Sequence, residues 1–533
     1  MNLRAYGDDT AFHDITQRHC EANRKSDLFV RIVIIAGGYI EENVRGDEGA
    51  GGGLNHCTNC NFHEVCLLGS SFAMRRFGYG NEAVSTFVGL CHNAMELLYL
   101  FSALGTFVLM AILQAAGEKW KKYIIAGISA ISVCFTVGVN VCLLRVYALG
   151  EGNENITKYY WMLVLASFAA GIDDMCICEI GSNGMSNYEV GQAMIGLTIS
   201  AYHWIAIRVL NYYEMDVDYW LITSQLVCIV FLSIVAAILW IAYLIIDKIM
   251  KSDSDSQAKG TQTGSFAKGF GQVFPLIVLC IAGYGFMYVI YPLISPFEMV
   301  DFEYQYPIQR LCLIAHAVAG VSVWLIDYYK VTSKDWYGHE QAGFHSVWLL
   351  VFLFFGIGFL FIYCMHFPTS GTAQLIVMKP YVVGFLTIMY YFLGRFSLGV
   401  TNMSIHANAD GQGEILSALN LAIYLIVLNV VKYISEAYIQ QFRLTRTKFK
   451  NGEAWPTNGM SKTGAALYWL KVGASVGYQN FKELATTDVK SRLGGPGKKP
   501  VQYRRVSITT DPSFALIGGS EMIDPLQVSY FSP

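Results

Sequence analysis

Long apolar stretches separated by short polar loops run through the middle of the chain. About ten of them reach the roughly 17 to 25 residues that cross the hydrocarbon core of a bilayer. Two of them, LVCIVFLSIVAAILWIAYLII and VWLLVFLFFGIGFLFIYC, are far longer than a strand. A transmembrane barrel would instead alternate apolar and polar residues in short segments. The pattern predicts transmembrane helices near Val84–Gln114, Tyr123–Val146, Tyr160–Ile180, Val190–Leu210, Tyr219–Ile249, Val273–Ile294, Ile308–Tyr329, Val347–Phe367, Tyr381–Met403 and Ile415–Tyr438.

Polar segments divide the chain into five regions. We expect a polar N-terminal region over residues 1–83, an N-terminal helical bundle over 84–250, a cytoplasmic linker over 251–270, a C-terminal helical bundle over 271–440 and a polar, disordered tail over 441–533. Inside the first region, LFVRIVIIAGGYI is apolar but short and carries Arg31, so it is either a degenerate first helix or an interfacial segment. In the tail, GAALYWLKV reads as one short amphipathic stretch.

Composition agrees with a protein whose solvent is the bilayer. The 533 residues are 54% hydrophobic and 14% charged, and their mean hydropathy is +0.39. The net charge of -3 gives no reason to expect a nucleic-acid partner. Because the stretch from Met1 to Ser26 is polar, we expect no cleaved signal peptide. We therefore expect a multi-pass protein of the plasma membrane or of an organelle membrane.

Basic residues in the short loops predict the orientation of the helices. The loop after the first apolar block, the linker and the loop after the seventh block are all basic and fall on one side, which predicts a cytoplasmic linker. The same alternation puts the tail outside, although the tail opens with Arg443 and Arg446. The sequon at Asn155 falls in a loop assigned to the outside and is a candidate glycosylation site.

Ionisable side chains inside the apolar blocks are the candidate functional residues. Each costs about 2.5 to 3.5 kcal/mol to place at membrane depth, so such residues normally face a cavity or a partner. The substrate-binding candidates are Glu96 in the first block, Asp173 and Asp174 in the third, and Arg310, His316 and Asp327 in the seventh, with Lys330 just beyond it. Neighbouring polar residues of the same kind are His92, Glu179, His203, Arg208, Arg395, Asn420 and Asn429.

Each of these candidates also has a structural explanation. Asp173 and Asp174 lie in a solvated loop if their helix ends early, and Asp327 sits at the water interface with Lys330 if its helix ends there. Arg310 can extend its head group from a helix end to the membrane surface. Three carboxylates in GIDDMCICEIGSNG, within two helical turns, favour a polar route through the membrane instead.

The remaining motifs give weak signals. Cys57, Cys60 and Cys66 form a pattern similar to a zinc or disulfide knot, but there is no second CxxC, and an incidental cluster is the better interpretation. The chain has no GxxxxGK[ST] loop, no HExxH and no nucleophile motif. We therefore expect neither an enzyme nor a cofactor nor a bound metal.

Several of these stretches resemble the equilibrative nucleoside transporter family. The likeness is carried by VGLCHNAMELLYLFSALGTFVLMAIL, ASFAAGIDDMCICEIGSNGMSNYEVGQAMIGLTISAY, QVFPLIVLCIAGYGFMYVIYPLISP and YPIQRLCLIAHAVAGVSVWLIDYYK, and it extends over most of Val84–Tyr438. It implies an all-α membrane protein of about ten or eleven helices in two bundles, major-facilitator-like, in a 6+5 arrangement. The family's first helix has no clear counterpart before Val84, and Val331 stands where the family has an Arg.

The resemblance implies facilitative transport of nucleosides or nucleobases by alternating access, with a small-molecule solute and the bilayer as partners. By the same resemblance, Asp327 and Lys330 would contact the ribose and Asp173 the edge of the base. Two alternatives stay open: a carrier for another small solute, such as an amino acid or a sugar, and a multi-pass protein that does not transport.

Overall fold

The computed structural model describes residues 61–152, 154–180, 185–245, 265–329, 347–409, 412–450, 454–483 and 489–493. Within these ranges every regular element is a helix. The expected segment LFVRIVIIAGGYI, Cys57, Cys60, Lys330 and most of the linker lie outside them. The longer helices are α3 (Asn61–Arg76), α4 (Val84–Ala116), α5 (Glu118–Leu149), α6 (Asn155–Ile180), α7 (Met185–Tyr212), α8 (Val217–Tyr243), α9 (Phe266–Cys280), α10 (Phe302–Tyr328), α11 (Val347–His366), α13 (Pro380–Asn408), α14 (Gly413–Lys450) and α15 (Lys462–Glu483).

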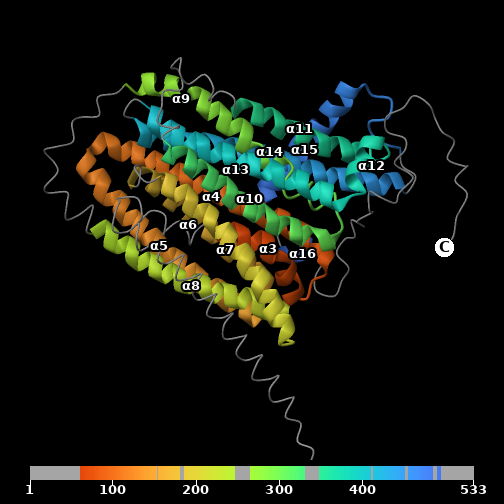
Figure 1. Ribbon diagram of the computed structural model, residues 1–533, viewed down its shortest axis with the longest axis horizontal. Coiled ribbons are helices and arrows are strands. Elements are labelled where there is room, and N and C mark those ends of the chain that lie inside the picture. Colours follow the sequence, from red (N-terminus) through yellow and green to blue (C-terminus); the bar gives the residue numbers. More distant parts are fainter. Residues whose placement is uncertain are drawn as a thin grey trace, which may run out of the picture.

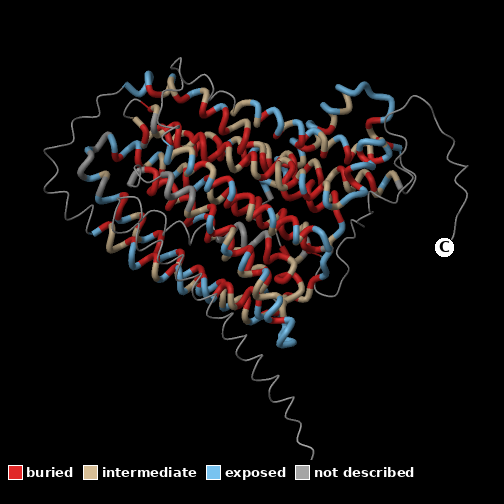
Figure 2. The backbone as a smooth tube through the Cα atoms, viewed as in Figure 1, coloured by how far each residue is buried: buried red, intermediate tan, exposed pale blue. Residues whose placement is uncertain are grey.

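Ten helices in this set are long and apolar enough to cross a membrane, and each corresponds to one of the ten predicted blocks. Large apolar side chains on the peripheral helices stay exposed, including Ile131 of α5, Phe231 of α8 and Phe352 of α11. Figure 2 shows the buried residues in the interior of the bundle and exposed residues along its outer helices. Such broad apolar exposure marks a surface that meets lipid. The chain is an all-α polytopic membrane protein, as predicted.

The helices form two halves. In the N-terminal half, α6 packs against α4 and α5, and α5 packs against α8; in the C-terminal half, α13 packs against α9, α10 and α14. The halves meet most extensively along two helix pairs, α4 with α14 and α7 with α10. Consecutive long helices run in opposite directions (Figure 1). One end of the bundle, here called the linker end, therefore holds the end of α8 and the start of α9. The opposite end, here called the tail end, holds the end of α14.

Glycines make the tight connections at both ends. Gly117 separates α4 from α5 with φ 120°, and Gly150 follows α5 with φ 67°, both in the region that side chains with a Cβ rarely enter. Asp216 starts α8 by accepting hydrogen bonds from the backbone N–H groups of Asp218 and Tyr219. These connections fix the antiparallel order of neighbouring helices.

Helix α3 was not predicted, and it belongs to the N-terminal half. It packs against α4 and α8, and Arg75 near its end donates to both carboxylate oxygens of Asp218 at 2.6 to 3.0 Å. The helix is only 16 residues long and weakly apolar, so its sequence carries no membrane-span signal. With α3 the N-terminal half has six described helices, and α9, α10, α11, α13 and α14 give the C-terminal half five long ones.

We expected the tail to be disordered, but part of it forms helix α15. Helix α15 packs against α14, where a Cβ added to Gly473 or Gly477 would come within 3 Å of a backbone oxygen of α14. Trp469 of α15 packs on Tyr438 and Phe442 of α14. Close glycine contacts and aromatic packing stabilise this helix, which is too polar to be predicted from hydrophobicity alone.

Two basic residues at the start of the tail take part in packing. Helix α14 continues to Lys450, and Arg443 donates to Glu298, a residue of the segment between α9 and α10. Arg446 is buried. The predicted side of the tail stays a prediction.

Candidate functional site

Helix α9 was expected to continue to Ile294, but it breaks inside the membrane. After Cys280 the chain passes through a π-helical turn (Ile281–Gly285) and a short 3-10 helix (Met287–Val289), and residues up to Val300 are turns. Gly283 lies so close to Ser397 of α13 that a Cβ there would be 2.4 Å from the Ser397 Cβ. Pro292 follows and has no N–H for a helix bond. The hydropathy of this block shows none of these local effects.

Side chains of the neighbouring helices satisfy the broken backbone. Tyr390 of α13 donates its hydroxyl to the carbonyl of Phe286 at 2.9 Å, and Ser435 of α14 donates to the carbonyl of Val289 at 2.7 Å. Non-helical backbone at membrane depth is tolerated only where protein or a water-filled cavity surrounds it. Discontinuous helices in transporters commonly border the substrate site. The break is therefore the natural place to search for a functional site.

Charged residues from both halves lie beside this break. His92 and Glu96 of α4 are buried to 2% and 5% exposure, with 3.6 Å between His92 Nε2 and Glu96 Oε1. Lys432 of α14 is 2% exposed and donates its ammonium to the His92 carbonyl at 2.6 Å. The Lys432 ammonium and the His92 ring also contact the Tyr288 ring, at 5.3 Å and 4.6 Å from its centroid. An ammonium and a carboxylate thus share one buried site at the junction of the two halves.

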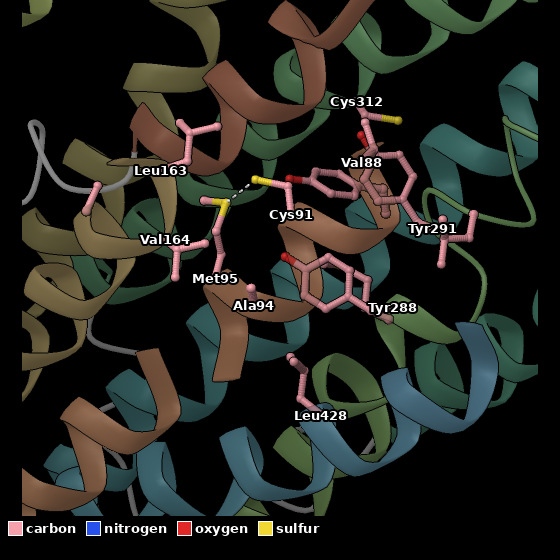
Figure 3. Packing of buried hydrophobic residues seen from close by; sticks show 14 of the residues in the cluster. Val88, Cys91, Ala94, Met95, Leu163, Val164, Tyr288, Tyr291, Cys312 and Leu428 are labelled. Carbon is pink, nitrogen blue, oxygen red and sulfur yellow. Dashed lines mark hydrogen bonds between the residues drawn. The ribbon is translucent and has the colours of Figure 1, made fainter. Parts of the chain in front are cut away.

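Figure 3 shows the packing around this point. Tyr288, which follows the break, lies near Ala94 of α4 and Leu428 of α14, and all three belong to one buried cluster. Cys91 and Met95 of α4 contact each other through their sulfur atoms at 3.5 Å. The charged groups therefore sit within an apolar interior in which unbalanced charge is expensive.

Arg395 of α13 extends the site into the C-terminal half. Its guanidinium lies over the rings of Tyr284 and Tyr391, at 5.3 and 5.4 Å from their centroids, and its Nε donates to the Tyr391 hydroxyl at 3.2 Å. His316 of α10 meets Tyr391 edge to face at 6.3 Å. The ring of Tyr284 also meets the ring of Tyr288 edge to face, with 6.3 Å between their centroids. These residues form one site with His92 and Lys432.

We call this site the central cluster. It contains two carboxylates, two cationic side chains, two histidines and three tyrosines: Glu96, Glu436, Arg395, Lys432, His92, His316, Tyr284, Tyr288 and Tyr391. The balanced charges reduce the cost of burial, and the rings supply flat apolar faces beside hydrogen-bonding groups. Such an arrangement can bind a small, flat, polar solute by stacking and hydrogen bonding.

Two predicted carboxylates lie on α6, next to the central cluster, where α6 packs against α4. Asp173 and Asp174 of α6 are buried, so they are not in a solvated loop. Tyr99 of α4 donates its hydroxyl to Asp174, and Tyr99 follows Glu96 by one helical turn. The neighbouring Gly171 packs directly against Ser102 and the Tyr99 carbonyl. The two aspartates therefore belong to the tight α4–α6 contact, next to the central cluster.

A second buried polar group joins the halves along α7 and α10. His203 of α7 lies 2.8 Å from the hydroxyl of Tyr306 of α10 through Nδ1, and 2.8 Å from Gln225 Oε1 of α8 through Nε2. Phe72 of α3 packs edge-on against both rings. We call these residues the histidine junction. It is a neutral network when His203 is unprotonated, and its partners use both ring nitrogens.

The structure does not bring the other predicted residues into the central cluster. Arg310 is half-buried on α10, one turn beyond Tyr306 of the histidine junction. Asp327 is half-buried at the end of α10, three turns beyond His316. The His316 and Asp327 positions were expected to act together, but their separation along the helix is about 16 Å. The exposed Arg208 stacks over Trp204 at 3.7 Å.

Asn155 begins α6, and its side chain already donates a hydrogen bond to the Gly150 carbonyl at 2.8 Å. The amide nitrogen that would carry a glycan is thus engaged in the turn. Glycosylation of Asn155 stays a prediction.

Among the described residues, no group of three or more His, Cys, Asp or Glu is placed to hold a metal ion.

Lys432 and Glu436 were missed by the sequence reading. They lie inside the last apolar block, four residues apart, which places both on one face of α14. That spacing of a cation and a carboxylate in an otherwise apolar stretch was the available signal. Both are nearly fully buried, so the helix places them at the junction of the halves and not at the membrane surface.

Comparison with known proteins identifies no family for this chain. No family model matches the chain, and no curated protein matches it.

Among solved structures, a bacterial homologue of the iron transporter ferroportin in an outward-facing state has 12% identity and a TM-score of 0.42, covering 83% of this chain and 98% of that one. A bacterial homologue of the lysosomal transporter Spinster in an inward-facing state has 11% identity and a TM-score of 0.42, covering 84% and 94%. A mutant of the nucleoside transporter NupG has 14% identity and a TM-score of 0.34, covering 80% and 99%. These similarities are too low to assign a family or a substrate.

Proposed function

We propose that this chain is a carrier for nucleosides or nucleobases that works by alternating access between its two halves. The single observation that carries the proposal is the central cluster: charged residues of α4 and α14 are buried together at the break in α9, beside the half-buried Arg395 of α13. Stability alone does not favour two buried carboxylates and a buried lysine, because apolar residues of the same size cost less to bury. Such groups at membrane depth usually line a route for solute or ions.

The chemistry of the cluster favours a flat, hydrogen-bonding solute. Tyr284, Tyr288 and Tyr391 offer ring faces for stacking, and His92 and Arg395 offer hydrogen-bond donors beside them. Aromatic rings next to a few polar groups are typical of small-molecule sites. The sequence resemblance to equilibrative nucleoside transporters favours a nucleoside over other flat solutes. Asp327, which that resemblance assigns to the ribose, lies too far along α10, so we propose Glu96 or Glu436 for the ribose hydroxyl groups.

A broader carrier function is the second candidate. The same balanced charges would suit a zwitterionic amino acid, which has one carboxylate and one ammonium. A solute panel distinguishes the two, because an amino-acid carrier would take up labelled amino acids and leave adenosine and hypoxanthine outside.

Uptake by the purified protein in proteoliposomes tests the proposal. We expect the wild-type chain to take up radiolabelled adenosine or hypoxanthine, with saturation and with competition by unlabelled nucleoside. Replacing Arg395 by Gln should lower uptake at least tenfold, because the stacked guanidinium and its bond to Tyr391 are lost.

Arg208→Gln is the matched control, since this exposed arginine also stacks on an aromatic ring but lies away from the cluster. It should leave uptake within twofold of the wild type. No uptake of either solute by correctly folded wild-type protein would refute a nucleoside or nucleobase carrier. Equal loss in both variants would refute the placement of the site.

A further inference from the structure

A line of polar side chains leads from the central cluster to the tail end. Asn480 of α15 donates to Gln440 Oε1 of α14 at 3.2 Å, and Gln440 donates to Glu436 Oε1 at 3.2 Å. Asn480 and Gln440 are half-buried, whereas Glu436 is 5% exposed. The line therefore runs from half-buried side chains of α14 and α15 into the interior of the protein.

The line continues from one half of the protein to the other. Glu436 packs so tightly against α4 that a Cβ on Gly89 would lie 2.8 Å from its carboxylate oxygen. One turn away on α14, Lys432 donates to the carbonyl of His92, whose ring is 3.6 Å from the Glu96 carboxylate. Buried titratable groups of α14 and α4 thus face each other across the junction of the halves.

Beyond Glu96 the line proceeds toward the linker end. His92, Glu96 and Tyr99 follow one another at spacings of four and three residues and so share one face of α4. Tyr99 donates its hydroxyl to Asp174 of α6, next to the buried Asp173. At about 1.5 Å per residue, the step from His92 to Tyr99 covers about 10 Å of membrane depth. Titratable groups therefore occupy successive turns across the interior of the membrane domain.

The charged and titratable groups around Glu436 and Glu96 come from every neighbouring element. They are His92 and Tyr99 of α4, Asp173 and Asp174 of α6, Tyr284 and Tyr288 at the break after α9, Tyr391 and Arg395 of α13, and Lys432 and Tyr433 of α14. Lys432 and Arg395 are the cationic side chains in this group besides histidine, whereas Glu96, Glu436, Asp173 and Asp174 supply four carboxylates. Adding a proton to either glutamate therefore reduces the excess of negative charge around the contact of the halves.

We propose that transport by this chain is coupled to the movement of a proton along this line, with Glu436 as the group that accepts the proton from the tail end. The inference rests on the proposed carrier function and replaces the uncoupled scheme that the family resemblance implies. A proton from water binds one oxygen of Glu436, passes by way of His92 to Glu96, and leaves through Asp174. One proton enters and one leaves, and no group is oxidised or reduced.

The position of the line across the α4–α14 contact explains how a proton couples to the carrier cycle. Glu436 and Lys432 belong to the C-terminal half, and His92 and Glu96 belong to the N-terminal half. Protonating Glu436 removes one of the two carboxylates that balance Lys432 and Arg395, and so changes the attraction between the halves. A ligand shifts a conformational equilibrium only by binding its states unequally, and a proton bound at this contact meets that condition.

Proteoliposomes with a pH-sensitive dye inside test the proposal on the whole protein. Adding adenosine outside should change the internal pH together with solute entry, and imposing a pH gradient should drive accumulation of adenosine above its equilibrium level. Solute entry with no pH change and no effect of the gradient would overturn proton coupling and leave the carrier function intact. Absence of any solute entry would instead refute the carrier function on which the inference rests.

Two isosteric variants locate the proton acceptor. Glu436→Gln should lower gradient-driven accumulation at least tenfold and should make the remaining adenosine entry independent of pH, because the group that accepts the proton is lost. Glu96→Gln should do the same, which covers the case in which Glu436→Gln does not fold. Glu154→Gln, which removes an exposed carboxylate paired with Lys158, is the control and should behave as wild type. Gradient-driven accumulation that persists in both cluster variants would overturn the assignment of the line.

Discussion

The two contacts between the halves differ in chemistry. The central cluster, along α4 and α14, holds buried charges of both signs, and the helix beside it is broken. The histidine junction, along α7 and α10, has a neutral core in which the His203 ring nitrogens meet Tyr306 and Gln225. A neutral hydrogen-bonded network holds helices in register at lower cost, whereas buried charges cost free energy and persist mainly where function needs them. The comparison assigns the solute to the first contact and a packing role to the second.

Removing a charge from the central cluster should have the largest effect. Lys432→Met leaves Glu436 and Glu96 with one cation fewer in a buried site, and breaking such a balance costs about 3 to 5 kcal/mol. We expect a clear drop in the thermal stability of the detergent-purified protein, and no measurable uptake.

The double variant Lys432→Met with Glu436→Gln sharpens this prediction. It removes one charge of each sign, so it should recover most of the lost stability without recovering proton coupling. If Lys432→Met alone is as stable as wild type, the ammonium is not balancing buried carboxylates, and the charged contact is no different from the neutral one.

Removing a hydrogen bond from the histidine junction should have the smallest effect. Tyr306→Phe deletes the hydroxyl that meets His203 Nδ1 and keeps the ring that packs on Phe72. A neutral hydrogen bond contributes about 0.5 to 1.5 kcal/mol net, so we expect a slightly lower melting temperature and uptake within twofold of wild type. An uptake loss as large as that of the Arg395 variant would place the solute at the second contact instead.

The sequence predicted the helices better than the site. The ten long apolar blocks gave the ten membrane-crossing helices, because hydrophobic length alone decides whether a segment can cross the bilayer. Helix α3 was missed, and of α15 only the short amphipathic stretch GAALYWLKV was predicted, for the converse reason: both helices are stabilised by contacts such as the Arg75–Asp218 pair and the close approach of Gly473 to α14, which hydropathy does not record. The break in α9 was missed as well, and there Gly283 lies against Ser397 of a distant helix.

The candidate site residues separated according to their neighbours. Glu96 and His316 lie in the central cluster, while Asp327 lies at a helix end and Arg310 lies one turn beyond Tyr306 on α10. The free-energy cost of placing an ionisable side chain at membrane depth makes all four residues equally good candidates. That cost does not tell which helices will face each other. Lys432 could have been found from its spacing to Glu436, but its contact with His92 joins residues 340 positions apart and is a property of the fold.

The most direct test of the central claim is the structure of the purified protein in complex with adenosine. We predict that the solute binds between the two halves beside the break in α9, with its base against Tyr288 or Tyr391 and its polar atoms within reach of Arg395 and Glu96. A solute bound near Asp327 at the linker end, or outside the contact of α4 with α14, would contradict the account.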